Sequence, residues 1–330
     1  MNDVALRCMP TAVWKEDDMI GTDKVKAMVA ILRTKGCWWA FQKGCTMCGY
    51  NIESDQGITT EDLRAQLASV KHKYAGEPMV KIYTSGSFLD DREVPSELRL
   101  EILDSFPQAQ KIIFETRPEF VTDETLGPLP KGKVLVALGL ESADDDVLRH
   151  SIRKGFTVAD YVKAAETLKR HAIPVRTYLL LKPPFLTEAR AIRDTAASIE
   201  FARPYSESIS INPVNVQSGT VIEEMWRRGD YRSPWIWSLV EVLKAGWRQG
   251  GPRLFSSPSG AGTLRGVHNC EKCDRKVLDA VQRFSFEQDP KCLDSLECGC
   301  KDEWKMLLQV QDVMATTVDL SRHLEDEIPL

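Results

Sequence analysis

Three cysteines near the start of the chain have the residue type and spacing of a metal-cluster site. Cys37, Cys45 and Cys48 are separated by seven and two residues, and each has a glycine next to it. Three thiolates can hold three irons of a [4Fe–4S] cube and leave the fourth iron open to a small-molecule ligand, whereas a closed cluster normally uses four cysteines. The next cysteine is Cys270. The spacing therefore favours an open-site cluster; a zinc knuckle short of one ligand and buried thiols are the alternatives.

A second group of cysteines lies near the end of the chain. Its four central members form two short pairs about 25 residues apart. Four sulfurs in two pairs suit a tetrahedral structural zinc ion. The central members are Cys270, Cys273, Cys298 and Cys300, and the alternates are His268 and Cys292. A second iron–sulfur cluster and thiols without metal are the other interpretations of this group.

The composition is that of a globular protein from a reducing compartment. The 330 residues are 43% hydrophobic and carry a net charge of −5. No apolar run approaches the roughly 20 residues of a membrane span, and the N-terminus lacks the apolar stretch of a signal peptide. Because the cysteines cluster, we expect metal binding in the cytoplasm and not a disulfide framework. The net charge argues against nucleic-acid binding by bulk electrostatics, although residues 252–276 carry five basic and two acidic side chains.

Strands and helices in alternation are expected to position these residues. Apolar runs predict strands at residues 27–33, 79–83, 111–114, 133–140, 174–181 and 208–216. Helical spacing and capping residues predict helices at residues 59–75, 95–105, 143–152, 157–171 and 187–202. Several strands are continuously apolar, which indicates parallel strands buried on both faces. Right-handed crossovers then give either a doubly wound sheet or a barrel.

The sequence changes character twice and so suggests three regions. Residues 1–25 are mixed polar and are expected to form a lead-in to the main α/β domain at 26–250. Residues 251–330 are expected to form a cysteine-rich lobe with a helix at about 301–325. The boundary near 250 follows a tryptophan-rich segment and precedes most of a loop rich in Gly, Ser and Pro.

Polar residues follow or end most of the predicted strands. In parallel α/β folds, ligands bind at the carboxyl ends of the strands. Each residue also has a structural explanation, such as a turn at Ser85-Gly-Ser87 or an ion pair between Glu115 and Arg117. Their coincidence at one edge of the sheet favours a binding site. The residues are Ser85, Gly86, Ser87, Glu115, Arg117, Glu141, Ser142, Lys182 and Asn212.

Together these motifs resemble the radical SAM superfamily. The set comprises Cys37/Cys45/Cys48, Ser85-Gly-Ser87, Glu115-Thr-Arg-Pro118, Leu138-Gly-Leu-Glu-Ser142 and Arg153-Lys-Gly155. The chain is similar to the branch that includes the radical SAM half of the elongator catalytic subunit. The wide cysteine spacing, Glu-Thr-Arg-Pro and the C-terminal cysteine group most resemble the archaeal archaeosine-synthesis family, RaSEA.

Two features depart from the common superfamily pattern. The cysteine spacing is C-x7-C-x2-C and not C-x3-C-x2-C, which we interpret as the marker of a subgroup. Ser-Gly-Ser stands where a glycine-glycine-acid motif is usual, which leaves open how the methionyl amine is held there. The implied fold is a partial (β/α)6 barrel with a small C-terminal cysteine-rich lobe.

The resemblance implies a [4Fe–4S] cluster on the first three cysteines and S-adenosylmethionine (SAM) on the open iron. Met47 would pack on adenine, the backbone near Tyr50 would pair with its edge, and Asn212 to Val214 would close the pocket. The candidates for the methionyl and ribose groups are Ser85, Gly86, Ser87, Arg117, Glu141 and Lys154. An electron from the cluster would cleave SAM to a 5′-deoxyadenosyl radical.

The resemblance also implies a substrate and partners. The substrate would be a tRNA whose D-loop 7-cyano-7-deazaguanine carries an added lysine. Hydrogen abstraction next to the new nitrogen and C–N cleavage would leave archaeosine, which makes the enzyme a radical SAM lyase. The lysine-adding archaeosine synthase alpha subunit and an electron donor are expected partners. Four basic residues, Arg253, Arg265, Arg275 and Lys276, are candidates for contacting the tRNA backbone.

Two other functions fit the same residues. One is a different radical SAM tRNA enzyme, elongator-like or transferring a methyl or sulfur group. The other is a metal-bearing module that binds nucleic acid without catalysis.

Overall fold

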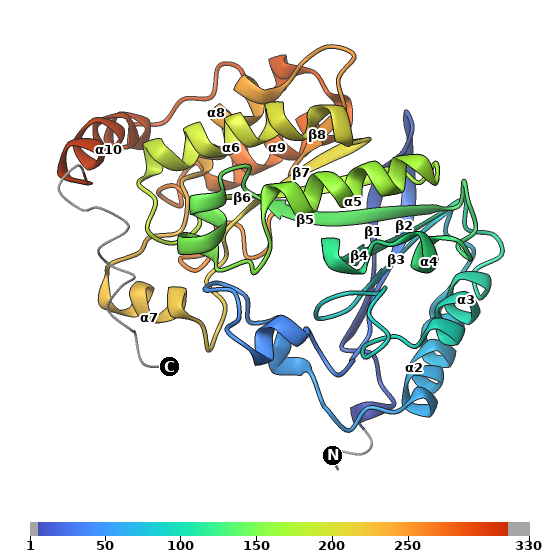
Figure 1. Ribbon diagram of the computed structural model, residues 1–330. Coiled ribbons are helices and arrows are strands. Elements are labelled where there is room, and N and C mark those ends of the chain that lie inside the picture. The colour runs from blue at the N-terminus through green and yellow to red at the C-terminus, as the bar shows by residue number, and fades with distance from the viewer. Residues whose placement is uncertain (1–5, 316–330) are drawn as a thin grey trace. The chain divides into compact units, whose positions relative to one another are not determined.

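The computed structural model describes residues 6–315, whose strands form one mixed sheet in the order β1 to β8. β1 and β2 form an antiparallel hairpin, β2 to β5 pair in parallel, and β7 pairs in parallel with β8. The strands are β1 (Ala12–Ile20), β2 (Asp23–Ile31), β3 (Met79–Tyr83), β4 (Lys111–Thr116), β5 (Val134–Glu141), β6 (Val175–Leu181), β7 (Ser208–Pro213) and β8 (Arg253–Phe255). Figure 1 labels them.

Helices connect most of the parallel strands. They are α2 (Thr60–Lys73), α3 (Ser96–Asp104), α4 (Asp123–Leu126), α5 (Val158–Arg170), α6 (Glu188–Ala202), α7 (Val221–Arg228), α8 (Ile236–Gly246), α9 (Asp274–Glu287) and α10 (Cys300–Ala315). Two shorter elements matter for the site: the 3₁₀ turn η1 (Trp38–Phe41) and the π-helix η4 (Val147–Ile152). Within residues 6–315, no helix has the length and apolar character that crossing a membrane requires.

This topology confirms the predicted α/β fold class and decides between the two architectures. A doubly wound sheet changes direction, so that its strands are out of sequence order, whereas here each strand neighbours the next in sequence. Sequential order with a run of parallel strands is the topology of a partial α/β barrel. The six predicted strands correspond to β2 through β7, and β3 was predicted at both of its ends.

The described part of the chain has eight strands, two of which the sequence did not predict. β1 lies in the segment expected to be a lead-in, and its sequence Lys15-Glu-Asp-Asp18 has none of the apolar alternation that identifies a strand. It is held by pairing with β2 over its full length. β8 has only three residues and pairs with Ser208–Ser210 of β7. The sheet therefore continues beyond residue 250.

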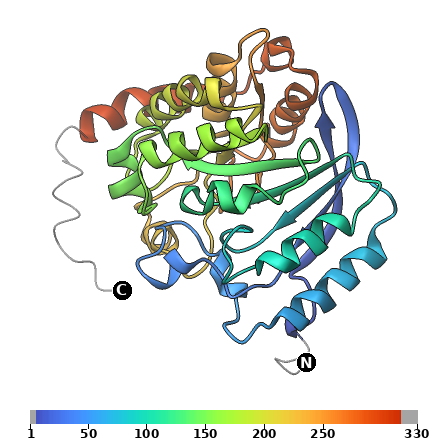
Figure 2. The same ribbon diagram turned by 45° about the vertical axis from the view of Figure 1, so that its right-hand side comes forward.

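The first of two compact units contains the described residues through Lys43 together with 50–139 and 159–176. Its core is built on β2, where Ala27 to Ala30 are completely buried. α2 and α3 lie side by side (Figures 1 and 2) and are joined by an ion pair between Arg64 and Glu101. The predicted N-cap of α2 is confirmed, because Thr59 and Asp62 form a reciprocal capping box.

The second unit contains 44–49, 140–158 and the described residues from 177 onward. α8 is buried along most of its length, and both α9 and α10 begin at a cysteine of the C-terminal group or directly after one. α10 covers part of the helix expected at 301–325, the rest of which lies outside the described residues. The domain boundaries 1–25, 26–250 and 251–330 stay a prediction.

Candidate functional site

Cys37 lies in a tightly packed loop that follows β2 in the first unit. Thr34 is buried, donates its hydroxyl to Glu93 at 2.7 Å, and accepts the backbone N–H of Gly36 at 3.1 Å. Gly36 has φ 86°, a left-handed conformation that glycine adopts without strain. Cys37 itself precedes η1 and is half-buried. The hydrogen bonds of Thr34 therefore hold the backbone that carries the Cys37 thiol.

Ser85-Gly-Ser87 packs directly against this cysteine. A Cβ atom at Gly86 would lie 2.7 Å from the Cα of Cys37 and even closer to the carboxylate of Glu93, so only glycine fits. The backbone N–H of Ser87 donates to Glu93 at 2.6 Å. Glu93 is thus the central acceptor beneath both loops. Burial raises its pKa to about 7.

The same tripeptide connects two other predicted site residues. The hydroxyl of Ser85 donates to the carbonyl of Tyr50 at 3.2 Å. The hydroxyl of Ser87 accepts the backbone N–H of Arg117 at 3.0 Å. The first unit therefore brings Cys37, Ser85, Tyr50 and Arg117 together around one loop. Their roles toward SAM stay predictions.

The Arg117 side chain is committed to neighbouring protein groups. It is buried, and its Nε donates to Glu119 at 2.5 Å. Its guanidinium lies 5.8 Å from the ring centre of Trp38 and 5.9 Å from that of Trp39. Glu119 and the two indoles therefore fix the orientation in which this cation would meet a carboxylate.

Cys45 and Cys48 lie in a loop of the second unit that is anchored by the residue after Cys45. Thr46 is buried; its N–H donates to the carbonyl of Ile152 at 3.0 Å and its hydroxyl to that of Ser151 at 2.6 Å. Its own carbonyl accepts the N–H of Ile222. The loop is therefore held between η4 and the start of α7.

Met47, the residue that the resemblance assigns to adenine, packs among apolar side chains. It contacts a buried apolar cluster that includes Val214, Val216 and Tyr231. Gly49, after the last cysteine, donates its N–H to the side chain of Gln217 at 2.5 Å. Two of the predicted adenine contacts, Met47 and Val214, thus belong to one apolar group. Another predicted adenine contact, Asn212, accepts a hydrogen bond from Ser210 at 3.0 Å.

Glu141 and Lys154 form an ion pair at the end of β5. Their side chains are 2.6 Å apart and nearly buried. Glu141 has φ 68° and Arg153, at the end of η4, has φ 57°. Non-glycine residues in this conformation are uncommon and concentrate at functional sites. The structure therefore pairs the two residues that the sequence predicted separately.

The first three cysteines have a donor set that fits an open-site iron–sulfur cluster. All three are half-buried, and all are thiols and not disulfides. Cys37 belongs to the first unit, while Cys45 and Cys48 belong to the second. Each thiol lies on a loop fixed by a buried threonine, Thr34 or Thr46.

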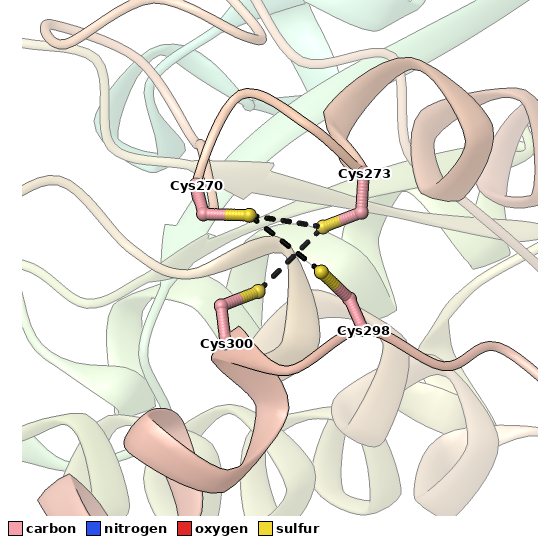
Figure 3. A group of neighbouring side chains, drawn as sticks. All are labelled: Cys270, Cys273, Cys298 and Cys300. Atoms are coloured by element: carbon pink, nitrogen blue, oxygen red, sulfur yellow. Dashed lines mark hydrogen bonds between the residues drawn. The ribbon is translucent and has the colours of Figure 1, made fainter.

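The four C-terminal cysteines converge on one point. Figure 3 shows their sulfurs facing one another, with three Sγ–Sγ distances of 3.6, 3.7 and 3.8 Å. Zinc–sulfur bonds of about 2.3 Å in a tetrahedron require a sulfur–sulfur distance of about 3.8 Å. The spacing therefore fits one tetrahedral ion better than an iron–sulfur cluster, whose inorganic core would hold the sulfurs further apart. The four are Cys270, Cys273, Cys298 and Cys300.

The two alternate ligands lie outside this group. The Nδ1 of His268 is 2.8 Å from the carbonyl of Gly266, and burial lowers the pKa of this histidine. The thiol of Cys292 donates to Glu287 at 3.3 Å. The geometry thus selects four sulfurs from the six candidates.

N–H groups surround the C-terminal sulfurs. The indole of Trp237 donates to Cys300 at 3.3 Å, and the amide of Asn269 donates to Cys273 at 3.4 Å. Burial raises the pKa of Cys273 and of Cys300, whereas the backbone N–H of Cys300 lowers the pKa of Cys298 to about 7. A divalent cation would offset the burial of charge and favour four thiolates.

Two of the four basic residues suggested for tRNA contact are occupied within the protein. Arg265 donates to the carbonyl of Val216 at 2.9 Å and to Glu223 at 2.7 Å. Arg253 donates to the carbonyl of Ser285 and lies 4.7 Å from the ring centre of Phe255. Both side chains thus stabilise contacts within the protein, and their contact with tRNA stays a prediction. Arg275 and Lys276 are exposed on α9.

Sequence reasoning missed Glu93 and the arginine beside it, Arg92. Neither belongs to a recognisable motif, and Glu93 reads as one more charged residue in the surface-like segment Asp90-Asp-Arg-Glu93. Its burial is visible only once the two loops that it joins are folded together.

Comparison with known proteins places the chain in a family. The sequence profile described as "Radical SAM superfamily" matches residues 31–196. An archaeosine synthase subunit beta of Methanosarcina acetivorans is 42% identical over 92% of this chain and 91% of its own length. A protein of the same name from Thermococcus kodakarensis is 37% identical over 90% of this chain and 96% of its own.

A solved structure agrees at the level of the fold. The Elp3 of Methanocaldococcus infernus, 19% identical, superposes over 82% of this chain and 64% of its own with a TM-score of 0.50. The chain therefore belongs to the radical SAM superfamily and, within it, to the family that contains the archaeosine synthase beta subunits.

Proposed function

We propose that this protein is a radical SAM lyase of tRNA modification, which cleaves the C–N bond of lysine-modified 7-cyano-7-deazaguanine in the D-loop to form archaeosine. The observation that carries the proposal is end-to-end similarity to proteins named archaeosine synthase subunit beta. The three-cysteine donor set on fixed loops supports it, because the reaction needs an iron with an open position.

Different residues of the candidate site would hold the cluster and the adenine of SAM. Cys37, Cys45 and Cys48 would hold the [4Fe–4S] cluster, which with bound SAM supplies one-electron chemistry that removes a hydrogen atom from the substrate. Met47, which packs against the buried cluster that contains Val214, would offer adenine an apolar side chain.

The polar ends of SAM would meet the residues at the strand ends. Glu141 has an oxygen for the ribose hydroxyls while Lys154 balances its charge. Arg117 and the backbone of Ser85-Gly-Ser87 would meet the methionyl group. Fixed orientation is the chain's contribution, because preorganised dipoles need no rearrangement during reaction.

Zinc at the four C-terminal cysteines completes the proposal. Its role is structural, since all four positions of the tetrahedron are filled by protein sulfurs. The expected partners are tRNA, the lysine-adding alpha subunit and an electron donor, and we place the activity in the cytoplasm.

The test uses anaerobically reconstituted full-length protein, reductant, SAM and tRNA carrying the lysine-modified base. We expect archaeosine in the tRNA and an equal amount of 5′-deoxyadenosine by mass spectrometry. Cys48→Ala should abolish both, and tRNA with the unmodified 7-cyano-7-deazaguanine should give no archaeosine. A methylated or thiolated base would indicate another radical SAM activity, and an iron-free protein that ignores SAM would indicate a non-catalytic module.

A further inference from the structure

The wide cysteine spacing adds aromatic side chains that metal binding does not use. Three of the seven residues between Cys37 and Cys45 are aromatic, namely Trp38, Trp39 and Phe41. All three lie in η1, where Trp38 and Trp39 are half-buried and Phe41 is 53% exposed. Large apolar side chains gathered at the surface mark sites of interaction more often than isolated ones do. The inserted turn therefore presents ring surface directly beside a cysteine of the candidate site.

Two guanidinium groups complete this surface. The Cζ of Arg92 lies 5.6 Å from the ring centre of Trp38 and 5.7 Å from that of Phe120. Arg117 lies against Trp38 and Trp39 at 5.8 and 5.9 Å. These distances are within the range of cation–π contacts. Aromatic rings and planar cations thus alternate within the first unit.

Carboxylates hold the group in a fixed arrangement. Asp90 accepts from Arg92 through both oxygens, at 2.7 and 2.9 Å. Glu119 accepts from Arg117 and also from the indole N–H of Trp38 at 2.9 Å. The side chains are therefore oriented before any partner arrives, which reduces the entropy lost on binding.

The electrostatics point to stacking and not to phosphate binding. Arg92 is paired with Asp90 and Arg117 with Glu119, so the two cations are balanced by two anions. A balanced surface attracts a polyanion weakly. Arg117 is buried, whereas the Arg92 side chain is 56% exposed and keeps an accessible planar group next to Trp38. Unpaired RNA bases are recognised by stacking on aromatic side chains and on arginine planes.

We propose that Trp38, Trp39 and Arg92 form a stacking platform for an unpaired base of the tRNA D-loop. This inference rests on the proposed function, in which a tRNA base must reach the candidate site. η1 begins at the residue after Cys37, so a base stacked here is held beside the first cysteine of the motif. The platform explains why the spacing between the first two cysteines carries aromatic residues.

The first experiment measures tRNA affinity by fluorescence anisotropy at several salt concentrations. Trp38→Ala should weaken binding roughly 5- to 100-fold, the range of a lost base–aromatic stack. The slope of log affinity against log salt should not change, because no phosphate contact is removed. Arg92→Lys keeps the charge but loses the plane, and should also weaken binding.

Trp14→Ala is the matched control. Trp14 lies on β1 of the same unit, is 39% exposed, and donates its indole N–H to Glu16 at 2.8 Å, as Trp38 does to Glu119. Its replacement should leave tRNA affinity unchanged. Iron content is measured for each variant. If Trp38→Ala loses its cluster, weaker tRNA binding by that variant would not be specific to stacking, and the affinity of Arg92→Lys then tests the platform.

A second experiment combines the variants with tRNA that has an abasic site at one D-loop position at a time. At one D-loop position, the abasic tRNA should bind the wild-type protein as weakly as intact tRNA binds Trp38→Ala. Combining that abasic tRNA with Trp38→Ala should then lower the affinity no further, because both changes remove the same contact. Additive losses at every position would overturn the platform. Unchanged tRNA affinity in both Trp38→Ala and Arg92→Lys would also overturn the platform. If the wild-type protein still forms archaeosine in that case, the proposed function remains supported. A wild type that neither binds tRNA nor forms archaeosine would overturn both.

Discussion

At the scale of single residues, the candidate site depends more on how closely its loops pack against each other than on charge. Gly86 is the clearest case, because its missing Cβ is what allows the Cys37 backbone and the Glu93 carboxyl to meet. The serines on either side supply hydrogen bonds, to Tyr50 from Ser85 and to Arg117 from Ser87. A loop that joins several strand ends in this way has little room to adjust.

Replacing Gly86 by alanine should therefore disturb the cysteine loop. The new methyl would overlap the Cα of Cys37, a backbone atom that cannot rotate away, and overpacking of this kind costs about 1–3 kcal/mol. We expect a lower iron content after anaerobic reconstitution. Both iron and sulfide are measured on the purified protein. Gly127→Ala is the control, since its Cβ would meet nothing nearer than 3.2 Å. Full iron and unchanged stability in Gly86→Ala would refute this packing argument.

At the scale of secondary-structure elements, the C-terminal cysteines act as a junction between helices. Cys273 caps α9 and Cys300 begins α10, while Trp237 of α8 donates to the Cys300 sulfur. Trp304 of α10 returns a hydrogen bond to Ser238 of α8 at 2.9 Å. A metal ion at the four sulfurs would thus fix where three helices meet.

The wild-type protein should contain one zinc ion per chain, measured by elemental mass spectrometry. Cys298→Ser should lose it, because a hydroxyl is a poor replacement for a thiolate, and its melting temperature should fall. Tryptophan emission should shift as Trp237 and Trp304 lose their fixed surroundings. Cys292→Ser is the matched control and should keep zinc and stability, since that thiol bonds to Glu287. Zinc loss in both variants, or in neither, would contradict the four-sulfur assignment.

At the scale of the whole molecule, a buried charge cluster joins strands that are far apart in the sequence. Asp18 of β1 lies 2.5 Å from Lys81 of β3 and 2.9 Å from Arg176 of β6. All three side chains are almost completely buried. Burial alone would raise the pKa of Asp18, but Arg176 and Lys81 favour its carboxylate and the net effect lowers that pKa.

This cluster predicts how stability depends on pH. A carboxyl whose pKa is lower in the folded than in the unfolded protein stabilises the fold above its unfolded pKa, about 3.9, and loses that contribution as pH falls further. Asp18→Asn should reduce the free energy of unfolding at pH 7 by about 3–5 kcal/mol, because two buried cations lose an anion. Urea titrations at pH 7 and at pH 3 measure the free energy of unfolding of the wild type and of Asp18→Asn. The difference in stability between wild type and variant should shrink at pH 3, and an equal difference at both pH values would show that Asp18 is not charged in the fold.

Local pattern was enough to predict much of this molecule. Apolar runs, several of them continuous, predicted β2 to β7, because strands buried on both faces need no partner information to be identified. Thr59 predicted the start of α2 because capping is settled within four residues. Cysteine spacing predicted a group of four sulfurs near the end of the chain, and the structure brings these four together. The cluster site on Cys37, Cys45 and Cys48 stays a prediction.

Contacts between distant segments decided the rest. The middle of β1 is charged, so the strand is recognised only by its pairing with β2, and β8 is too short to show a period. Glu93 became a central acceptor only when two loops folded over it, and the intramolecular partners of Arg253 and Arg265 were visible only in the fold. Which four of the six candidate ligands lie close enough together to hold one ion also followed from the fold. Sequence determined which residues could do the chemistry, because type and local spacing carry that information; tertiary structure decided which of them meet, because burial and partnership depend on residues far along the chain.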